Sequence, residues 1–223
     1  MNIPFTTEEF FQVFEVYNSA IWPAHVVAYL LGVAAIVCAF SKSALSDRLA
    51  SASLAAFWIW IGVFYHILHF ATVNRVAYVF GLLFVLQGVV FLIFGLIYQR
   101  LSFQVTRTVT FGAGACLIIY ALVVYQFLGI VAGHDWPRIP IFGVAPCPMV
   151  IFTFGLLLWA VKPVPFFIYI IPLLWALVGT SAAISLGVPQ DYGLTVSGFL
   201  YVVLAIIARL KHKSTGESRR SHI

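Results

Sequence analysis

Long apolar stretches separated by short polar turns make up most of this chain. A helix that crosses a bilayer needs about 20 predominantly apolar residues. Seven stretches approach or reach that length, and we expect each to form a membrane-spanning helix. They cover residues 20–40, 50–72, 76–98, 108–131, 147–161, 165–187 and 192–209. The fifth is short, and we expect it to continue into a non-helical entry segment.

The residues before the first stretch have an amphipathic pattern instead. Thr6 is followed three residues later by Glu9, which is the spacing of a capping box at a helix start. Polar residues then gather on one helix face and aromatic residues on the other. The polar face comprises Glu8, Gln12, Glu15 and Ser19, and the apolar face Phe10, Phe14, Tyr17 and Ile21. We expect an interfacial helix that packs over the outer mouth of the bundle.

Within the third stretch, glycine recurs every seven residues, at Gly81, Gly88 and Gly95. Small residues repeated along one helix face allow two membrane helices to approach closely. We therefore expect this face to be a packing seam against a neighbouring helix, with no direct role in function.

Composition supports a membrane protein. The chain is 63% hydrophobic and 9% charged, whereas about a quarter of the residues in a soluble domain are charged. The sequence therefore predicts an all-α, polytopic membrane helix bundle whose first partner is the lipid bilayer. We divide it into an outer amphipathic helix (1–19), a seven-helix transmembrane domain (20–209) and a basic cytoplasmic tail (210–223).

The positive charge indicates orientation and not nucleic-acid binding. Of the 12 Lys and Arg residues, two fall on one side of the predicted topology and ten on the other. Cytoplasmic loops carry the excess of Lys and Arg in membrane proteins. We therefore place the N-terminus outside and the C-terminus in the cytoplasm. The outer pair is Arg75 and Arg138; the inner set is Lys42, Arg48, Arg100, Arg107, Lys162, Arg209, Lys211, Lys213, Arg219 and Arg220.

This topology brings most of the side chains capable of chemistry to the outer third of the bundle. The two histidines of YHILHF, His66 and His69, are one helical turn apart and share a helix face. Ionisable groups within a membrane usually face the bundle interior or a cavity. The outer set comprises His25, His66, His69, His134, Asp135, Cys147 and Asp191.

Cys147 and Asp191 each have two interpretations. Cys147 stands between prolines at a predicted helix start, where the helix dipole favours the thiolate that binds metals or reacts. The alternative is a small apolar plug in a proline turn. Asp191 precedes the last span, where it could cap the helix or provide a counter-charge at the outer mouth.

Binding of a transition metal or haem for uptake, sensing or redox work is the leading functional hypothesis. We assign His66, His134 and Cys147 as candidate ligands, and His25, His69, Asp135 and Asp191 as weaker ones. A buried polar network that fixes helix register is the structural alternative. The functional alternatives are a small-solute transporter or channel without bound metal, and a non-catalytic accessory subunit with a membrane-protein partner or a second copy. Nothing fixes a nucleophile beside a base, so we favour a protein that is not an enzyme.

The chain also resembles a known family over nearly its whole length apart from the tail. The resemblance rests on the strings PFTTEEFFQVFEVYNSAIWPAH, WIGVFYH, VNRVAYVFGLLFVLQG, GVAPCPMVIFTFGLLL and PLLWALVGTSAAISLGVPQDYGL. They are similar to an uncharacterised bacterial family of small multipass proteins, domain of unknown function family 6064. The resemblance implies an inner-membrane protein and no established activity. It also implies counterparts of His66, Cys147 and Asp191, and an often aromatic residue at the position of His69.

Overall fold

The computed structural model describes residues 4–41, 43–105 and 108–220, with the backbone alone for 211–220. Helices make up most of the described chain. In order they are α1 (Thr7–Ile21), α2 (Ala24–Phe40), α3 (Ala44–Trp60), α4 (Ala77–Val90), α5 (Val109–Ile119), α6 (Tyr125–Val131), α7 (Pro146–Leu157), α8 (Phe166–Leu186) and α9 (Tyr192–Arg220). The π-helical segments η1 (Ile61–Ile67) and η3 (Phe91–Ile97) extend α3 and α4, and η4 (Tyr120–Val124) joins α5 to α6. Two 3-10 turns are η2 (Phe70–Thr72) and η5 (Pro189–Asp191).

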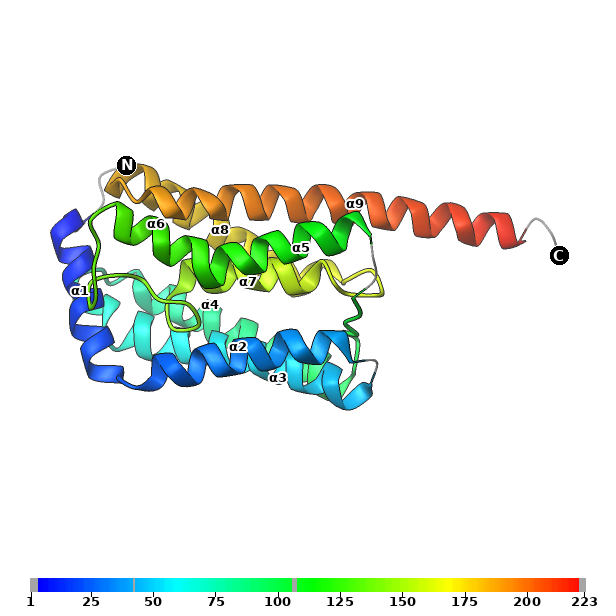
Figure 1. The fold of residues 1–223 in the computed structure, drawn as a ribbon, viewed down its shortest axis with the longest axis horizontal. Helices are drawn as coiled ribbons and strands as arrows, with labels where there is room; N and C mark the ends of the chain where they lie inside the picture. Colours follow the sequence, from blue (N-terminus) through cyan, green and yellow to red (C-terminus); the bar gives the residue numbers. More distant parts are fainter. Residues whose placement is uncertain (1–3, 42, 106–107, 221–223) are drawn as a thin grey trace.

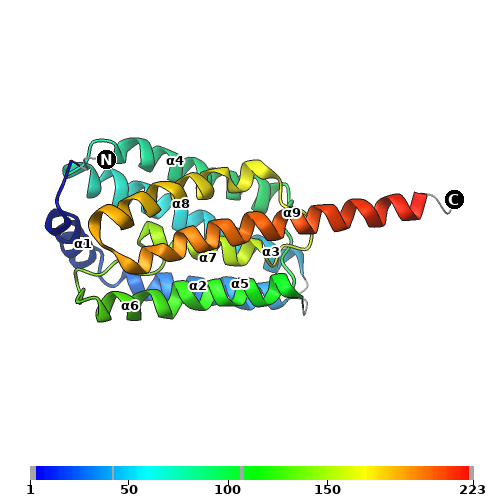
Figure 2. The same cartoon turned by 90° about the horizontal axis from the view of Figure 1, so that it is seen from above.

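Helices α2 to α9 run along one common axis and α1 crosses one end of the bundle (Figures 1 and 2). The chain bends by 87° between α1 and α2. At the opposite end, α9 continues well beyond the other helices. The all-helical membrane bundle expected from the sequence is therefore confirmed.

The number of spans is smaller than expected. Within the described residues, five helices are long and apolar enough to cross a membrane, or six if α1 and α2 form one bent span. The two remaining predicted spans are α2, with 17 residues, and α7, with 12. At about 1.5 Å per residue, α7 is about 18 Å long, well short of the hydrocarbon core.

The short helix α7 lies inside the bundle and does not face lipid. All of its residues are buried, and it packs against α5, α8, α9 and η4. Non-helical backbone at membrane depth is tolerated where protein surrounds it. The non-helical segments before and after α7 are therefore compatible with a position inside the bundle. The expected non-helical entry corresponds to residues 132–145, which lead to Pro146 from the α1 end.

The capping box at the start of α1 forms as predicted. The Thr6 hydroxyl accepts from the Glu9 backbone N–H at 3.2 Å, and the Glu9 carboxylate accepts from the Thr6 backbone N–H at 2.7 Å. The apolar face of α1 is buried against the end of the bundle, including Phe10, Phe14 and Tyr17. The helix therefore covers one mouth of the bundle; that this mouth is the outer one stays a prediction.

The glycines of α4 and η3 form the expected seam against α3. A Cβ atom added at Gly88 would lie 2.9 Å from the backbone oxygen of Ala55, and one at Gly95 would lie 2.5 Å from the Cβ of Ser51. These distances are shorter than van der Waals contact. Glycine is therefore required for α3 and α4 to approach as closely as they do.

Basic residues gather at the end of the bundle opposite α1. The turns at the α1 end contain Arg75 and Arg138. The opposite end holds Arg48, Arg100, Lys162 and Arg209. Lys42 and Arg107, also counted on that side, lie outside the described residues. The expected orientation rests on this unequal distribution and stays a prediction.

Candidate functional site

Helix α1 contacts three of the histidines singled out in the sequence. The His25 Nε2 donates to Asn18 Oδ1 at 3.1 Å, since that amide oxygen can only accept. The rings of His69 and Tyr17 lie 5.0 Å apart, and His134 stacks on Phe11 at 3.8 Å. The structure therefore brings these histidines to one end of the bundle, but each has its own partner on α1.

The loop after α6 is tied to α1 by polar contacts. The Asn18 amide donates to the carbonyl oxygens of Pro137 at 2.6 Å and Ile139 at 2.8 Å. Arg138 pairs with Glu8 at 2.6 Å and lies 3.8 Å from Glu15. The Glu8 contact raises the pKa of the Arg138 guanidinium. Together these contacts hold α1 across the mouth of the bundle.

His134 lies in the same loop and is partly buried. Partial burial and, secondarily, the positive charge of Arg138 lower the pKa of His134 below its ordinary value. The side chain of the adjacent Asp135 is exposed; its backbone oxygen accepts from the Arg138 N–H at 2.8 Å. This local arrangement fixes the loop and leaves His134 directed at Phe11, not at Cys147.

Beneath α1 lies a cavity of about 280 Å³, which we call the α1 cavity. Its walls are mostly aromatic, and its base is polar. The walls include Phe10, Phe14, Tyr65, Phe70, Phe80 and Trp175, and the base comprises Cys147 and Asp191. Exposed residues also line it: Val178 and Ser185 of α8, and Val76 directly before α4. The cavity therefore reaches the surface where α4 and α8 lie side by side.

Three buried side chains meet at the base of the α1 cavity. The Tyr125 hydroxyl donates to Asp191 Oδ1 across 66 residues of sequence. The Cys147 thiol faces the same carboxylate. Cys147 is in the first turn of α7, as the sequence predicted, and Asp191 ends η5 at the start of α9. The base thus joins α6, α7 and α9.

Asp191 is a buried carboxylate without a cationic partner. Its side chain is 3% exposed. Within the described residues, the ion pairs belong to Arg138 and not to Asp191. A buried charge is costly unless it is paired and hydrogen-bonded. The carboxylate accepts from Tyr125 and borders the cavity.

His66 lies behind the aromatic wall. It is fully buried, and neither ring nitrogen has a hydrogen-bond partner among the residues that the structure describes. Its neighbours are rings: Phe84 at 4.7 Å and Trp175 at 4.9 Å between centroids. Trp175 also lines the α1 cavity and packs near the Cys147 sulfur, because both approach within 4 Å of the Cβ position of Gly179. His66 therefore supports the cavity wall.

The candidate metal ligands do not form one cluster. Among the described residues, no group of three or more His, Cys, Asp or Glu side chains is placed to hold a metal ion. Cys147 and Asp191 meet, but His66 is enclosed by rings and His134 stacks on Phe11. His69 Nδ1 donates to the Phe64 carbonyl at 2.7 Å.

Several site residues were missed from the sequence. Tyr125, Tyr65 and Trp175 were read as part of apolar spans, yet Tyr125 is hydrogen-bonded to Asp191 and the other two line the α1 cavity. Buried tyrosine and tryptophan usually find a polar partner. That tendency was the available signal, but it could not identify the partner.

Comparison with known proteins identifies a family and no individual relative. The sequence model of DUF6064, described as a family of unknown function, matches residues 7–215. Neither the curated proteins nor the solved structures include a match. Because the match covers most of the chain, from α1 into α9, the resemblance noted in the sequence is confirmed: the chain belongs to the DUF6064 family.

Proposed function

We propose that this membrane protein binds a small apolar molecule that carries a positive charge or a strong hydrogen-bond donor, and that the α1 cavity holds it. The observation that carries the proposal is the Asp191 carboxylate, which is buried at the cavity base and has no cationic partner among the described side chains. A bound cation or donor would supply the partner that the described side chains do not.

The aromatic walls suit the same kind of ligand. A cation over aromatic faces is attracted by the ring quadrupoles, most strongly where water is excluded. Phe10, Phe14 and Tyr65 provide such faces opposite the polar base. The volume of about 280 Å³ is close to the lower end of the range typical of small-molecule sites. A compact organic cation therefore fits better than a large cofactor.

Binding from one end is better supported than flow through the molecule. The α1 cavity ends at Cys147, the second residue of α7, and all residues of α7 are buried within the bundle. A solute would therefore reach the site between α4 and α8 and meet packed side chains beyond it. This favours a receptor or carrier for small solutes over an open channel.

A matched pair of probes tests the proposal: benzyltrimethylammonium and its neutral isostere neopentylbenzene. Both have the same shape and differ in one charge. We expect the purified protein in detergent to bind the cation more tightly. Asp191→Asn should weaken binding of the cation by about tenfold or more, because it removes the negative charge that would pair with the buried ammonium, and a loss of about 1.4 kcal/mol is tenfold. Titration calorimetry would measure both probes.

Asp135→Asn is the control, because it removes a carboxylate from the same end of the bundle without touching the cavity. It should bind the cation as the unaltered protein does. Equal affinity for the two probes, or equal effects of the two Asn variants, would overturn the proposal. Folding of each variant is checked by its thermal transition.

A metal or haem site is the second proposal, and one observation favours it: both nitrogens of the buried His66 have no partner in the described structure. With Cys147 it would supply two ligands after a rearrangement around Trp175. Metal analysis and the visible spectrum of protein from metal-replete cells test this, beside His66→Leu and Cys147→Ala. Absence of both stoichiometric metal and a Soret band would exclude it.

A further inference from the structure

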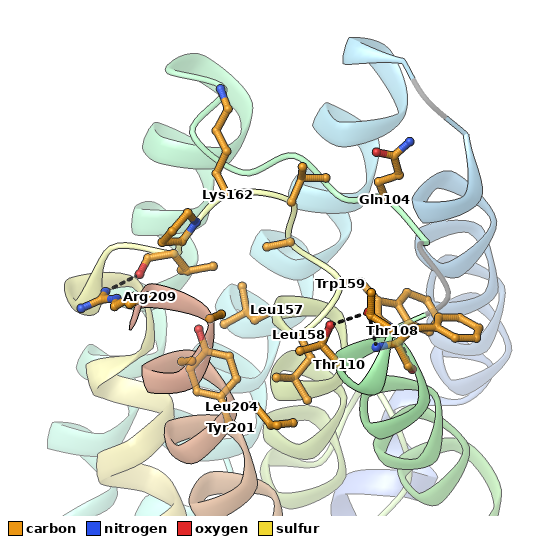
Figure 3. A pocket seen from close by; sticks show the side chains of 17 residues that line it. Gln104, Thr108, Thr110, Leu157, Leu158, Trp159, Lys162, Tyr201, Leu204 and Arg209 are labelled. Carbon is orange, nitrogen blue, oxygen red and sulfur yellow. Dashed lines mark hydrogen bonds between the residues drawn. The ribbon is translucent and has the colours of Figure 1, made fainter. Parts of the chain in front are cut away.

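A second cavity lies at the end of the bundle opposite α1, and its volume is about 230 Å³. We call it the α5–α9 cavity, because the start of α5, residues 157–164 and the segment 201–209 of α9 line it. Figure 3 shows Lys162 and Gln104 at one side of this space and Leu204 and Tyr201 at the other, with Leu157 and Leu158 between. The cavity therefore has a polar rim and an apolar interior.

The rim is held by backbone hydrogen bonds. The Gln104 N–H donates to the Trp159 carbonyl and the Val161 N–H to the Ser102 carbonyl, each at 2.9 Å. The Trp159 indole donates to the Phe111 carbonyl at 3.0 Å, which links this turn to α5. The turn that carries Lys162 is thus fixed to two neighbouring segments, and the cavity is built into the fold.

The rim is also electropositive. Arg209 donates to the Val164 carbonyl at 2.7 Å and lies 5.9 Å from the Tyr169 ring, as Figure 3 shows for the hydrogen bond. A guanidinium has five N–H donors, so this contact leaves donors for a ligand. Neither Arg209 nor Lys162 forms an ion pair within the described part of the chain. The N-terminus of α5 adds a positive dipole end.

We infer that the α5–α9 cavity binds an anionic phospholipid from the bilayer. The phosphate would lie between Lys162 and Arg209, and one acyl chain would follow Leu204 and Leu157 into the apolar interior. Basic pockets between membrane helices recognise anionic headgroups in this way. Free phosphate would bind the basic rim and leave the apolar interior empty. A phospholipid would bind the rim through its phosphate and fill the interior with its acyl chain. This inference stands independently of the function proposed for the α1 cavity.

Native mass spectrometry of the full chain tests the lipid site. The protein is released from nanodiscs of equal parts phosphatidylglycerol and phosphatidylcholine, and the retained lipid is identified. We expect one phosphatidylglycerol to be retained in preference to phosphatidylcholine. The double variant Lys162→Gln/Arg209→Gln should lower its retention by about tenfold or more, since each basic residue contributes about 1 kcal/mol near an anionic surface.

The matched control is Arg48→Gln/Arg100→Gln, which removes the same charge from the same end of the bundle but outside the cavity. It should retain phosphatidylglycerol. Ala205→Phe fills the apolar interior without changing charge and should also release the lipid. Equal retention of both lipids, equal loss in the two double variants, or displacement by inorganic phosphate would each overturn the inference.

Discussion

The imidazole of His66 shows what a polar side chain costs inside this bundle. It is surrounded by Phe80, Phe84 and Trp175, and both nitrogens are buried without a partner in the described part of the chain. An unsatisfied buried polar group costs about 1–3 kcal/mol. A residue retained at that cost either has a partner that is not part of the chain or is tolerated because its ring completes the aromatic wall.

Replacement of His66 tests whether its unpartnered nitrogens destabilise the fold. His66→Leu removes both unpartnered nitrogens at similar volume, so we expect the free energy of unfolding to rise by about 1–2 kcal/mol. His69→Leu is the matched control and should lower it by about 1 kcal/mol, since His69 donates to the Phe64 carbonyl. Thermal unfolding in detergent would show whether each variant is more or less stable than the unaltered protein. A loss of stability in His66→Leu would contradict the expected cost of the two unpartnered nitrogens.

Because His134 is partly buried beside Arg138, we predict that stability depends on pH. Burial and Arg138 lower the pKa of His134 in the folded protein, so the unfolded chain takes up its proton first as the pH falls. Below about 6.5, the ordinary value, the unfolded state then binds more protons and the folded state loses stability. We expect His134→Gln to reduce this loss between pH 7.5 and 5.5. Denaturation curves at each pH would show it, and unchanged slopes would contradict it.

For single residues, the sequence predicted the end of the bundle at which a side chain lies, but not the side chains that it contacts. The direction of each apolar stretch was enough to bring His25, His69 and His134 toward the same end. Pairing depends on helix rotation and packing, which no local pattern determines. Tyr125 and Asp191, for example, are 66 residues apart and meet only because α6 and η5 pack together. The predicted cluster of His66, His134 and Cys147 did not form for the same reason.

Helix α1 shows how far a local pattern reaches at the scale of an element. Its capping box and its aromatic face were both predictable, since each depends on residues within one or two turns. Its attachment to the loop after α6 was not predictable. The Asn18 amide donates to the carbonyls of Pro137 and Ile139, which are about 120 residues away in the chain. The same helix therefore closes the α1 cavity through contacts that only the folded chain reveals.

The glycine seam between α3 and α4 gives a prediction about elements. Gly88→Ala places a Cβ 2.9 Å from the Ala55 carbonyl oxygen and 2.5 Å from Ile59, so α3 and α4 must separate. We expect a loss of about 1–3 kcal/mol, as in other overpacked sites. Gly112→Ala, with no neighbouring atom within 4 Å, should instead stabilise α5 by about 0.5–1 kcal/mol. Thermal unfolding would reveal opposite shifts, and equal shifts would refute the seam.

For the whole molecule, hydropathy predicted the class of fold more reliably than the number of spans. A helix in the centre of the bundle and a helix that faces lipid have equally apolar sequences, because both are kept from water. Helix α7 is such a case: its residues are all buried, and it ends after 12 residues. The count of seven treated it as an independent span, whereas in the structure its neighbours shield it.

Orientation is the last property that belongs to the molecule as a whole. Helices α2 to α9 pass back and forth along the bundle, so the N-terminal helix and the end of α9 lie at opposite ends (Figure 1). Because the basic turns gather opposite α1, we expect the C-terminus in the cytoplasm. A fluorescent reporter active only in the cytoplasm should work at the C-terminus, and a phosphatase active only outside should not.

The same fusions placed after Val131, in the loop beside α1, should give the reverse result and serve as the internal control. The orientation determines which ligands reach the two cavities. With the C-terminus inside, the α1 cavity samples solutes and lipids of the outer leaflet, and the α5–α9 cavity samples anionic lipid of the inner one. A reversed reporter pattern would exchange these compartments and contradict the positive-inside argument, while leaving the chemistry of both cavities unchanged.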